Sequence, residues 1–153
     1  ERIASQIQLN AGSVAGLTAR FLPQMLKARH GVVINIASTA AFQPVPTMAV
    51  YAATKAFVLS FTEALWQETR GSGVRVLALC PGATDTGFFA AADDRPFMTR
   101  GRQTPQRVVS TALAAIGSTS PTVVSGWVNR LTVLGPRFAP RRFVPAVARL
   151  TVR

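Results

Sequence analysis

The chain has 153 residues, 48% of them hydrophobic, so it is long and apolar enough for one domain with a moderate core and is not a disordered chain. Its net charge of +11 lies at one end, because residues 95–153 carry ten arginines and no acidic residue, while residues 1–94 are nearly balanced. The single cysteine excludes an internal disulfide framework, and no long apolar run predicts a transmembrane helix. We therefore expect a soluble protein of the reducing cytoplasm.

The first predicted element is a helix that runs to about Arg29. Apolar residues recur at spacings of three, four and seven along it, as expected for one face of a helix: Ile3, Ile7, Val14, Leu17, Phe21 and Met25. An α/β domain normally places a strand before such a helix. The chain is therefore expected to begin partway through the strand–helix alternation rather than at its first element.

Alternating strands and helices follow. Two short β-branched runs, Gly31–Ser38 and Gly73–Cys80, predict buried parallel strands. A helix over residues 51–70 connects them and ends at a glycine-serine-glycine turn. After a turn-rich loop, Thr104 as N-cap and Pro105 at the first helical position predict another helix. The strand–helix–strand order predicts the α/β class with a doubly wound parallel sheet.

Chemically distinctive residues fall where the predicted strands end. Ser38 ends the first strand, Tyr51 begins the next helix, and Pro81-Gly82 follows the second strand, so all should meet in one crevice. Tyr51 and Lys55 are four apart and share a helix face. An ammonium and a helix N-terminus both favour a phenolate, so we expect a lowered pKa for Tyr51, suited to proton transfer near neutrality.

The ordered set of Ser38, Tyr51, Lys55 and Pro81-Gly82 resembles the short-chain dehydrogenase/reductase family. The resemblance implies a Rossmann-like fold and hydride transfer between NAD or NADP and a carbonyl/secondary alcohol pair. It implies that Tyr51 is the acid/base, that Ser38 holds the substrate oxygen, and that Lys55 binds the nicotinamide ribose and lowers the Tyr51 pKa.

The resemblance extends to three further positions. Asn10 matches the family's helix asparagine, whose backbone helps to hold a water beside the lysine. Reading "LNAG" as the family's Asn-Asn-Ala-Gly motif is rejected, because the preceding residues are helical and only one Asn is present. In "PGATDT", Thr84 and Thr86 match the positions after Pro81-Gly82 that contact the cofactor.

The family's glycine-rich turn, which seats the cofactor pyrophosphate, has no counterpart in these 153 residues. We therefore expect the C-terminal part of a reductase domain, with a catalytic core over residues 1–90 and a substrate loop, a helix and a basic segment over residues 91–153. Alone, the chain is expected to be inactive. The alternative is a non-catalytic remnant or interaction module with the same fold.

Partners are expected to be small ketones or alcohols, apolar or acyl, because apolar residues flank the predicted crevice: Phe42, Pro44, Val45, Met48, Phe88, Phe89, Phe97 and Met98. By family resemblance, the intact protein is expected to be a homo-oligomer. The tail over residues 138–153 is a candidate for weak membrane-surface contact, although Pro140 and Pro145 interrupt it. We expect no nucleic-acid partner, since no basic stripe is interleaved with aromatic residues.

The remaining reactive side chains predict no second site. Cys80 is expected to be a buried strand residue rather than a nucleophile, because no histidine lies near it in sequence. His30 lies in a turn at the end of a predicted helix, where a solvated cation is the ordinary role. One cysteine and one histidine do not make a metal site.

Overall fold

A computed structural model of the chain describes residues 1–87 and 102–151. Its N-terminal helical segment comprises α1 (Arg2–Ile7), a π-helical turn (Gln8–Gly12) and α2 (Ser13–Ala28). The segment ends at Arg29, which adopts the left-handed conformation with φ 51°. The predicted first helix is therefore confirmed, with a widened turn inside it that apolar spacing does not reveal.

Three parallel strands form the sheet: β1 (Gly31–Ile36), β2 (Val74–Cys80) and β3 (Thr122–Val124), in the order β1-β2-β3. Gly31 pairs with Val74, and this register continues to Ile36 and Leu79. The first strand is two residues shorter than predicted, because Ser38 turns out of the sheet to cap a short 3₁₀ helix. Within the described chain β1 is an edge strand, and Val32 and Ile36 are exposed on it.

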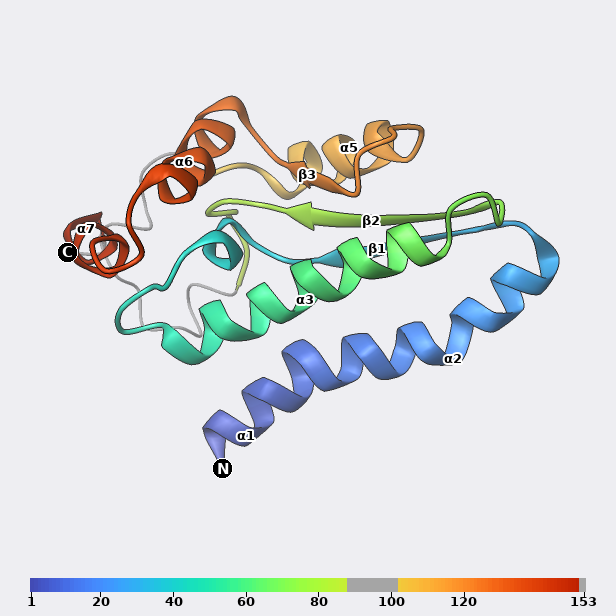
Figure 1. Cartoon of the computed structure of the whole chain (residues 1–153), viewed down its shortest axis with the longest axis horizontal. Helices are drawn as coiled ribbons and strands as arrows, with labels where there is room; N and C mark the ends of the chain where they lie inside the picture. Colours follow the sequence, from blue (N-terminus) through green and yellow to red (C-terminus); the bar gives the residue numbers. More distant parts are fainter. Residues whose placement is uncertain (88–101, 152–153) are drawn as a thin grey trace.

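Helices cover both faces of the sheet, as a doubly wound fold requires (Figure 1). α3 (Ala49–Glu68) packs on one face, where α1 contacts α3 and α2 contacts β1, and α5 (Pro105–Ala115) packs on the other. Thr104 caps α5 as predicted, since its hydroxyl accepts a hydrogen bond from the backbone N–H of Arg107 at 3.3 Å. The predicted fold class is confirmed.

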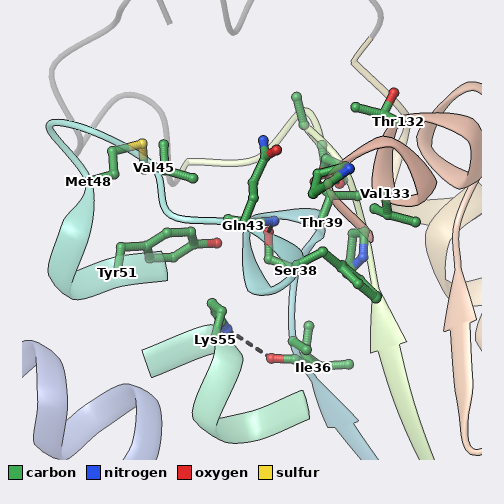
Figure 2. Close-up of a pocket in the computed structure, with 18 of the residues that line it drawn as sticks. Ile36, Ser38, Thr39, Gln43, Val45, Met48, Tyr51, Lys55, Thr132 and Val133 are labelled. Atoms are coloured by element: carbon green, nitrogen blue, oxygen red, sulfur yellow. Dashed lines mark hydrogen bonds between the residues drawn. The ribbon is translucent and has the colours of Figure 1, made fainter. Parts of the chain in front are cut away.

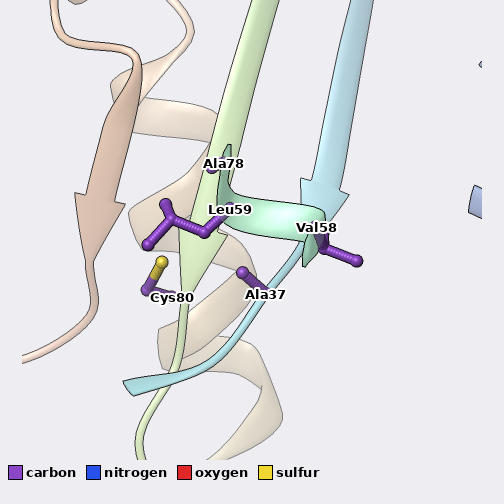
Figure 3. Close-up of a cluster of buried hydrophobic side chains, with 5 residues drawn as sticks. All are labelled: Ala37, Val58, Leu59, Ala78 and Cys80. Atoms are coloured by element: carbon purple, nitrogen blue, oxygen red, sulfur yellow. The ribbon is translucent and has the colours of Figure 1, made fainter. Parts of the chain in front are cut away.

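Two apolar clusters form the core, one on each face of β2. Figure 3 shows the cluster between α3 and the sheet, made of Ala37, Val58, Leu59, Ala78 and Cys80. The second, beneath α5, contains Leu79, Val108 and Ala112. Because β2 contributes to both clusters, all of its residues but the exposed Arg75 are buried, which explains its unbroken apolar run from Val76 to Cys80.

The C-terminal part forms two helices that sequence inspection did not predict. α6 (Trp127–Phe138) and α7 (Val144–Thr151) lie beyond the carboxyl end of β2 (Figure 1). Of the two prolines in the tail, Pro140 falls between α6 and α7, and Pro145 falls in the first turn of α7, where the missing N–H costs little. Among the residues described, no helix has the length and hydropathy needed to cross a bilayer.

Candidate active site

A cavity of about 390 Å³ opens at the carboxyl ends of β1 and β2. Figure 2 shows side chains from the turn after β1, from α3 and from α6 surrounding it. Seven of the eight residues predicted for the site line this cavity: Ser38, Tyr51, Lys55, Pro81, Gly82, Thr84 and Thr86. The eighth, Asn10, lies behind it in the π-helical turn.

Ser38 is positioned by the turn that ends β1. Its backbone is extended, and its Oγ accepts a hydrogen bond from the N–H of Ala40 at 3.1 Å, which caps the 3₁₀ helix over Thr39–Phe42. The same side chain is hydrogen-bonded to Tyr51. The capping bond leaves the serine proton available, so the hydroxyl can donate to a second oxygen in the cavity.

Tyr51 lies in the first turn of α3, and its hydroxyl points toward Ser38 (Figure 2). Burial raises the pKa of Tyr51, and the hydrogen bond with Ser38 opposes this rise without cancelling it. The expectation of a lowered pKa is therefore wrong, because removing the phenol from water outweighs the hydrogen bond with Ser38. At neutral pH the side chain is a protonated phenol, the form that donates a proton.

Lys55 lies one helical turn after Tyr51, and its Nζ is 5.8 Å from the centre of the tyrosine ring. Nζ donates a hydrogen bond to the carbonyl oxygen of Ile36 at 2.8 Å, which holds the ammonium at the end of β1. Burial lowers the pKa of Lys55. An ammonium has three N–H groups, and the bond to Ile36 uses one of them.

Asn10 reaches the site indirectly, through a residue that sequence inspection missed. Its Nδ2 donates to Oγ1 of Thr54 at 3.3 Å, and the Thr54 hydroxyl donates to the carbonyl oxygen of Tyr51 at 2.7 Å. Thr54 is buried, so this chain ties the π-helical turn to the first turn of α3. Thr54 immediately precedes Lys55, and that adjacency is the only signal of its role in the sequence.

The turn after β2 carries the predicted cofactor-contacting residues. Thr84 Oγ1 donates to the carbonyl oxygen of Gly82 at 3.0 Å, and Thr86 Oγ1 donates to the carbonyl oxygen of Thr84 at 3.5 Å. Thr84 also forms a parallel bridge with Gln103, which fastens this turn to the residues before α5. Gly82 lies against the side chain of Asn129 on α6, with no room for a Cβ.

The cavity wall is largely apolar. Of the residues predicted to flank the crevice, Phe42, Val45 and Met48 line it, whereas Pro44 does not. The other four, Phe88, Phe89, Phe97 and Met98, lie outside the described residues. Sequence inspection missed the contribution of α6, which supplies Thr132, Val133 and Pro136. The apolar spacing between Trp127 and Phe138 is the signal that predicts such a helix.

Cys80 and His30 remain outside the candidate chemistry. Cys80 is fully buried, and burial raises the pKa of its thiol to about 12, so the reactive thiolate is disfavoured. In residues 1–87 and 102–151, no group of three or more potential ligands is placed to hold a metal ion.

Comparison with known proteins finds dehydrogenases and reductases among the relatives of this chain. Residues 1–96 match the family model described as short chain dehydrogenase. Very-long-chain 3-oxoacyl-CoA reductase-A of Danio rerio is 32% identical over 142 residues, which cover 88% of this chain and 42% of the relative. The chain thus spans less than half the length of this curated relative.

Solved structures agree in fold. A short-chain dehydrogenase from Sphingobium yanoikuyae in complex with NADPH is 28% identical with a TM-score of 0.74, covering 84% of this chain and 51% of that one. A second short-chain dehydrogenase, from Burkholderia cenocepacia J2315 in complex with NADP, has a TM-score of 0.78 at 23% identity. The match covers 95% of this chain and 60% of that one. At that identity, the second likeness shows the fold alone.

Proposed function

Because this chain belongs to the short-chain dehydrogenase family, a family of oxidoreductases, we propose that it carries the catalytic part of an NAD(P)-dependent reductase. Its substrate is a carbonyl or secondary alcohol with an apolar substituent. The observation that supports this most strongly is the convergence of Ser38, Tyr51 and Lys55, from two elements of the fold, on one cavity.

The residues present fit a nicotinamide cofactor. Lys55 has N–H donors beyond the one bonded to Ile36, which suits the hydroxyls of a ribose. The backbone of Pro81-Gly82 and the hydroxyls of Thr84 and Thr86 border the same cavity and suit a carboxamide. The relative whose structure holds NADPH supports this choice of cofactor. When bound, the cofactor supplies or accepts the hydride.

The chain's own residues supply the proton and hold the oxygen. In reduction, Ser38 donates a hydrogen bond to the carbonyl oxygen, and Tyr51 donates its phenolic proton to the same oxygen as the alcohol forms. The raised pKa of Tyr51 keeps that proton in place at neutral pH. The phenolate left behind is stabilised by the ammonium of Lys55, whose Nζ is 5.8 Å from the centre of the tyrosine ring. Alcohol oxidation reverses these steps and is favoured by higher pH.

The apolar wall supports an apolar substrate. Phe42, Val45, Met48, Val133 and Pro136 line the cavity and place carbon atoms against any group attached to the reacting carbon. A reductase of very-long-chain 3-oxoacyl substrates among the relatives is consistent with this chemistry.

The test is Tyr51→Phe in the protein that carries this chain, assayed by NADPH oxidation with a series of ketones of increasing apolar size. The ring still packs, so we expect unchanged circular dichroism and unchanged NADPH affinity, with kcat lowered by about 10²–10⁴-fold. Wild-type rates in the variant would refute tyrosine-dependent reduction. A wild-type protein that binds NADPH and reduces no ketone in the series would favour the non-catalytic module.

A further inference from the structure

The outward face of α6 carries a stripe of large apolar side chains that no residue of the described chain covers. The stripe consists of Trp127, Leu131, Leu134 and Phe138, whose exposed fractions are 71%, 61%, 43% and 86%. Single exposed apolar residues are ordinary, but a whole helix face of this kind marks an interaction surface.

Helix geometry places the stripe opposite the packed face. At about 100° per residue, the four side chains fall within an arc of about 60°. Val133 and Asn129 lie on the other side, where Val133 is buried and Asn129 contacts Gly82. α6 is therefore already docked to the domain through one face, and the stripe is a second face directed to the outside.

The surroundings of the stripe are mainly positive, although Glu63 of α3 borders the same groove as Leu134, Arg130 and Arg137. Arg130 and Arg137 lie along one side of it on α6, and both are exposed, although Nε of Arg130 donates a hydrogen bond to the carbonyl oxygen of Val124 at 3.1 Å. Arg141, Arg142 and Arg149 follow in the next turn and in α7, and residues 102–151 contain no acidic side chain. Phe143, directly before α7, and Val147 on α7 are exposed as well. A helix with Trp, Leu and Phe on one side and arginines beside them has the composition of an interfacial helix that binds anionic lipid.

The charge around the stripe and its position in the fold indicate which kind of partner covers it. A second copy of the chain would bring five arginines against five, an excess of like charge that opposes self-association through this face. A chain segment that extended the sheet would pair with the open edge at β1, whereas α6 contacts β3 at the other end of the sheet. Neither partner fits the stripe as well as an anionic lipid bilayer, which has an apolar interior beneath a negatively charged surface.

We propose that α6 lies flat on an anionic lipid bilayer, with Trp127, Leu131, Leu134 and Phe138 at the acyl boundary and the arginines on the headgroup phosphates. The opposite face of the same helix supplies Thr132, Val133 and Pro136 to the cavity, so a lipid-bound α6 forms a wall between the bilayer and the site. The proposal does not depend on the proposed reductase activity.

The experiment uses the 153-residue chain with Trp66→Phe, which leaves Trp127 as the only tryptophan. Vesicles of phosphatidylglycerol are compared with vesicles of phosphatidylcholine. We expect sedimentation with phosphatidylglycerol and a blue shift of Trp127 emission, with little of either for phosphatidylcholine. Added salt should weaken binding, because it screens the arginine contacts.

Matched variants separate the stripe from the general positive charge. Leu131→Glu should weaken binding to phosphatidylglycerol by about tenfold or more. Leu113→Glu, on α5 with a similar exposed fraction of 58%, makes the same change of charge and should have a much smaller effect. Replacing Arg141 by Gln should cost about fivefold at low salt, and Arg20→Gln on α2 clearly less.

Three results would overturn the proposal. One is the absence of wild-type binding to phosphatidylglycerol. The second is binding without a blue shift of Trp127, or with equal losses in Leu131→Glu and Leu113→Glu, which would indicate charge attraction alone. The third is a dimer that Leu131→Glu converts to a monomer while vesicle binding is unchanged, which would make the stripe a self-association surface.

Discussion

The side chain of Asn129 fills the space in which a side chain at position 82 would lie. A Cβ on Gly82 would be 2.6 Å from Oδ1 of Asn129 and closer still to Nδ2. Asn129 is held there by a hydrogen bond from Nδ2 to the carbonyl oxygen of Ser125 at 2.6 Å. The glycine after β2 thus lets α6 approach the turn that borders the cavity.

This contact predicts a strong coupling between two substitutions. Gly82→Ala should destabilise the protein by about 1–3 kcal/mol, because the new methyl group overlaps a fixed side chain. Asn129→Ala should cost about 1 kcal/mol through the lost hydrogen bond. Urea unfolding of the double variant should show Gly82→Ala nearly harmless once Asn129 is removed. Additive losses would show that the glycine serves another purpose.

Ser38 should control the titration of Tyr51. Tyr51 is the only tyrosine in the chain, so the near-ultraviolet absorbance of phenolate reports it alone. We expect a pKa above the ordinary phenol value, and a further rise in Ser38→Ala, because the hydrogen bond from Ser38 is the influence that lowers it. Ser110→Ala, on the exposed face of α5, is the matched control and should leave the titration unchanged. A lower pKa in Ser38→Ala would contradict the geometry.

Lys55 should affect the pH dependence of turnover. In Lys55→Met the phenolate of Tyr51 loses a cation 5.8 Å from its ring, so its pKa rises and the alkaline limb of the rate profile moves to higher pH. We also expect kcat/KM to fall about tenfold or more, since charged hydrogen bonds to the cofactor are lost. Lys27→Met removes the other lysine, in the last turn of α2, and should change neither quantity. Identical profiles for the two variants would remove Lys55 from the mechanism.

The 153-residue chain by itself should bind NADPH weakly and reduce no ketone. It provides side chains for the nicotinamide end, but its sequence lacks a glycine-rich turn for the pyrophosphate, which contributes much of the affinity for a dinucleotide. Titration of NADPH fluorescence should show no saturation at micromolar protein. Micromolar binding would mean that this chain completes the cofactor site unaided.

The convergence of the site was predictable because it follows from topology. Parallel strands end at the same edge, so Ser38 and Pro81 had to be neighbours, and the four-residue helical repeat put Lys55 beside Tyr51. The direction of the Tyr51 pKa shift was not predictable, because it depends on how completely the fold encloses the phenol. The Thr54 link was likewise hidden, since it requires knowing that the π-helical turn packs against α3.

β1 carries one polar residue on its buried face, and this has a consequence for folding accuracy. Asn35 donates a hydrogen bond from Nδ2 to Oγ1 of Thr62 on α3 at 3.0 Å, and Thr62 donates in turn to the carbonyl oxygen of Val58 at 2.6 Å. A strand shifted by one residue would present Ile34 or Ile36 to Thr62 and turn the amide of Asn35 to the α5 face. Both misplaced groups would then lack partners in an apolar layer. The hydrogen bond between Asn35 and Thr62 therefore favours the correct strand register over the shifted one. The apolar residues of the sheet alone would tolerate both registers.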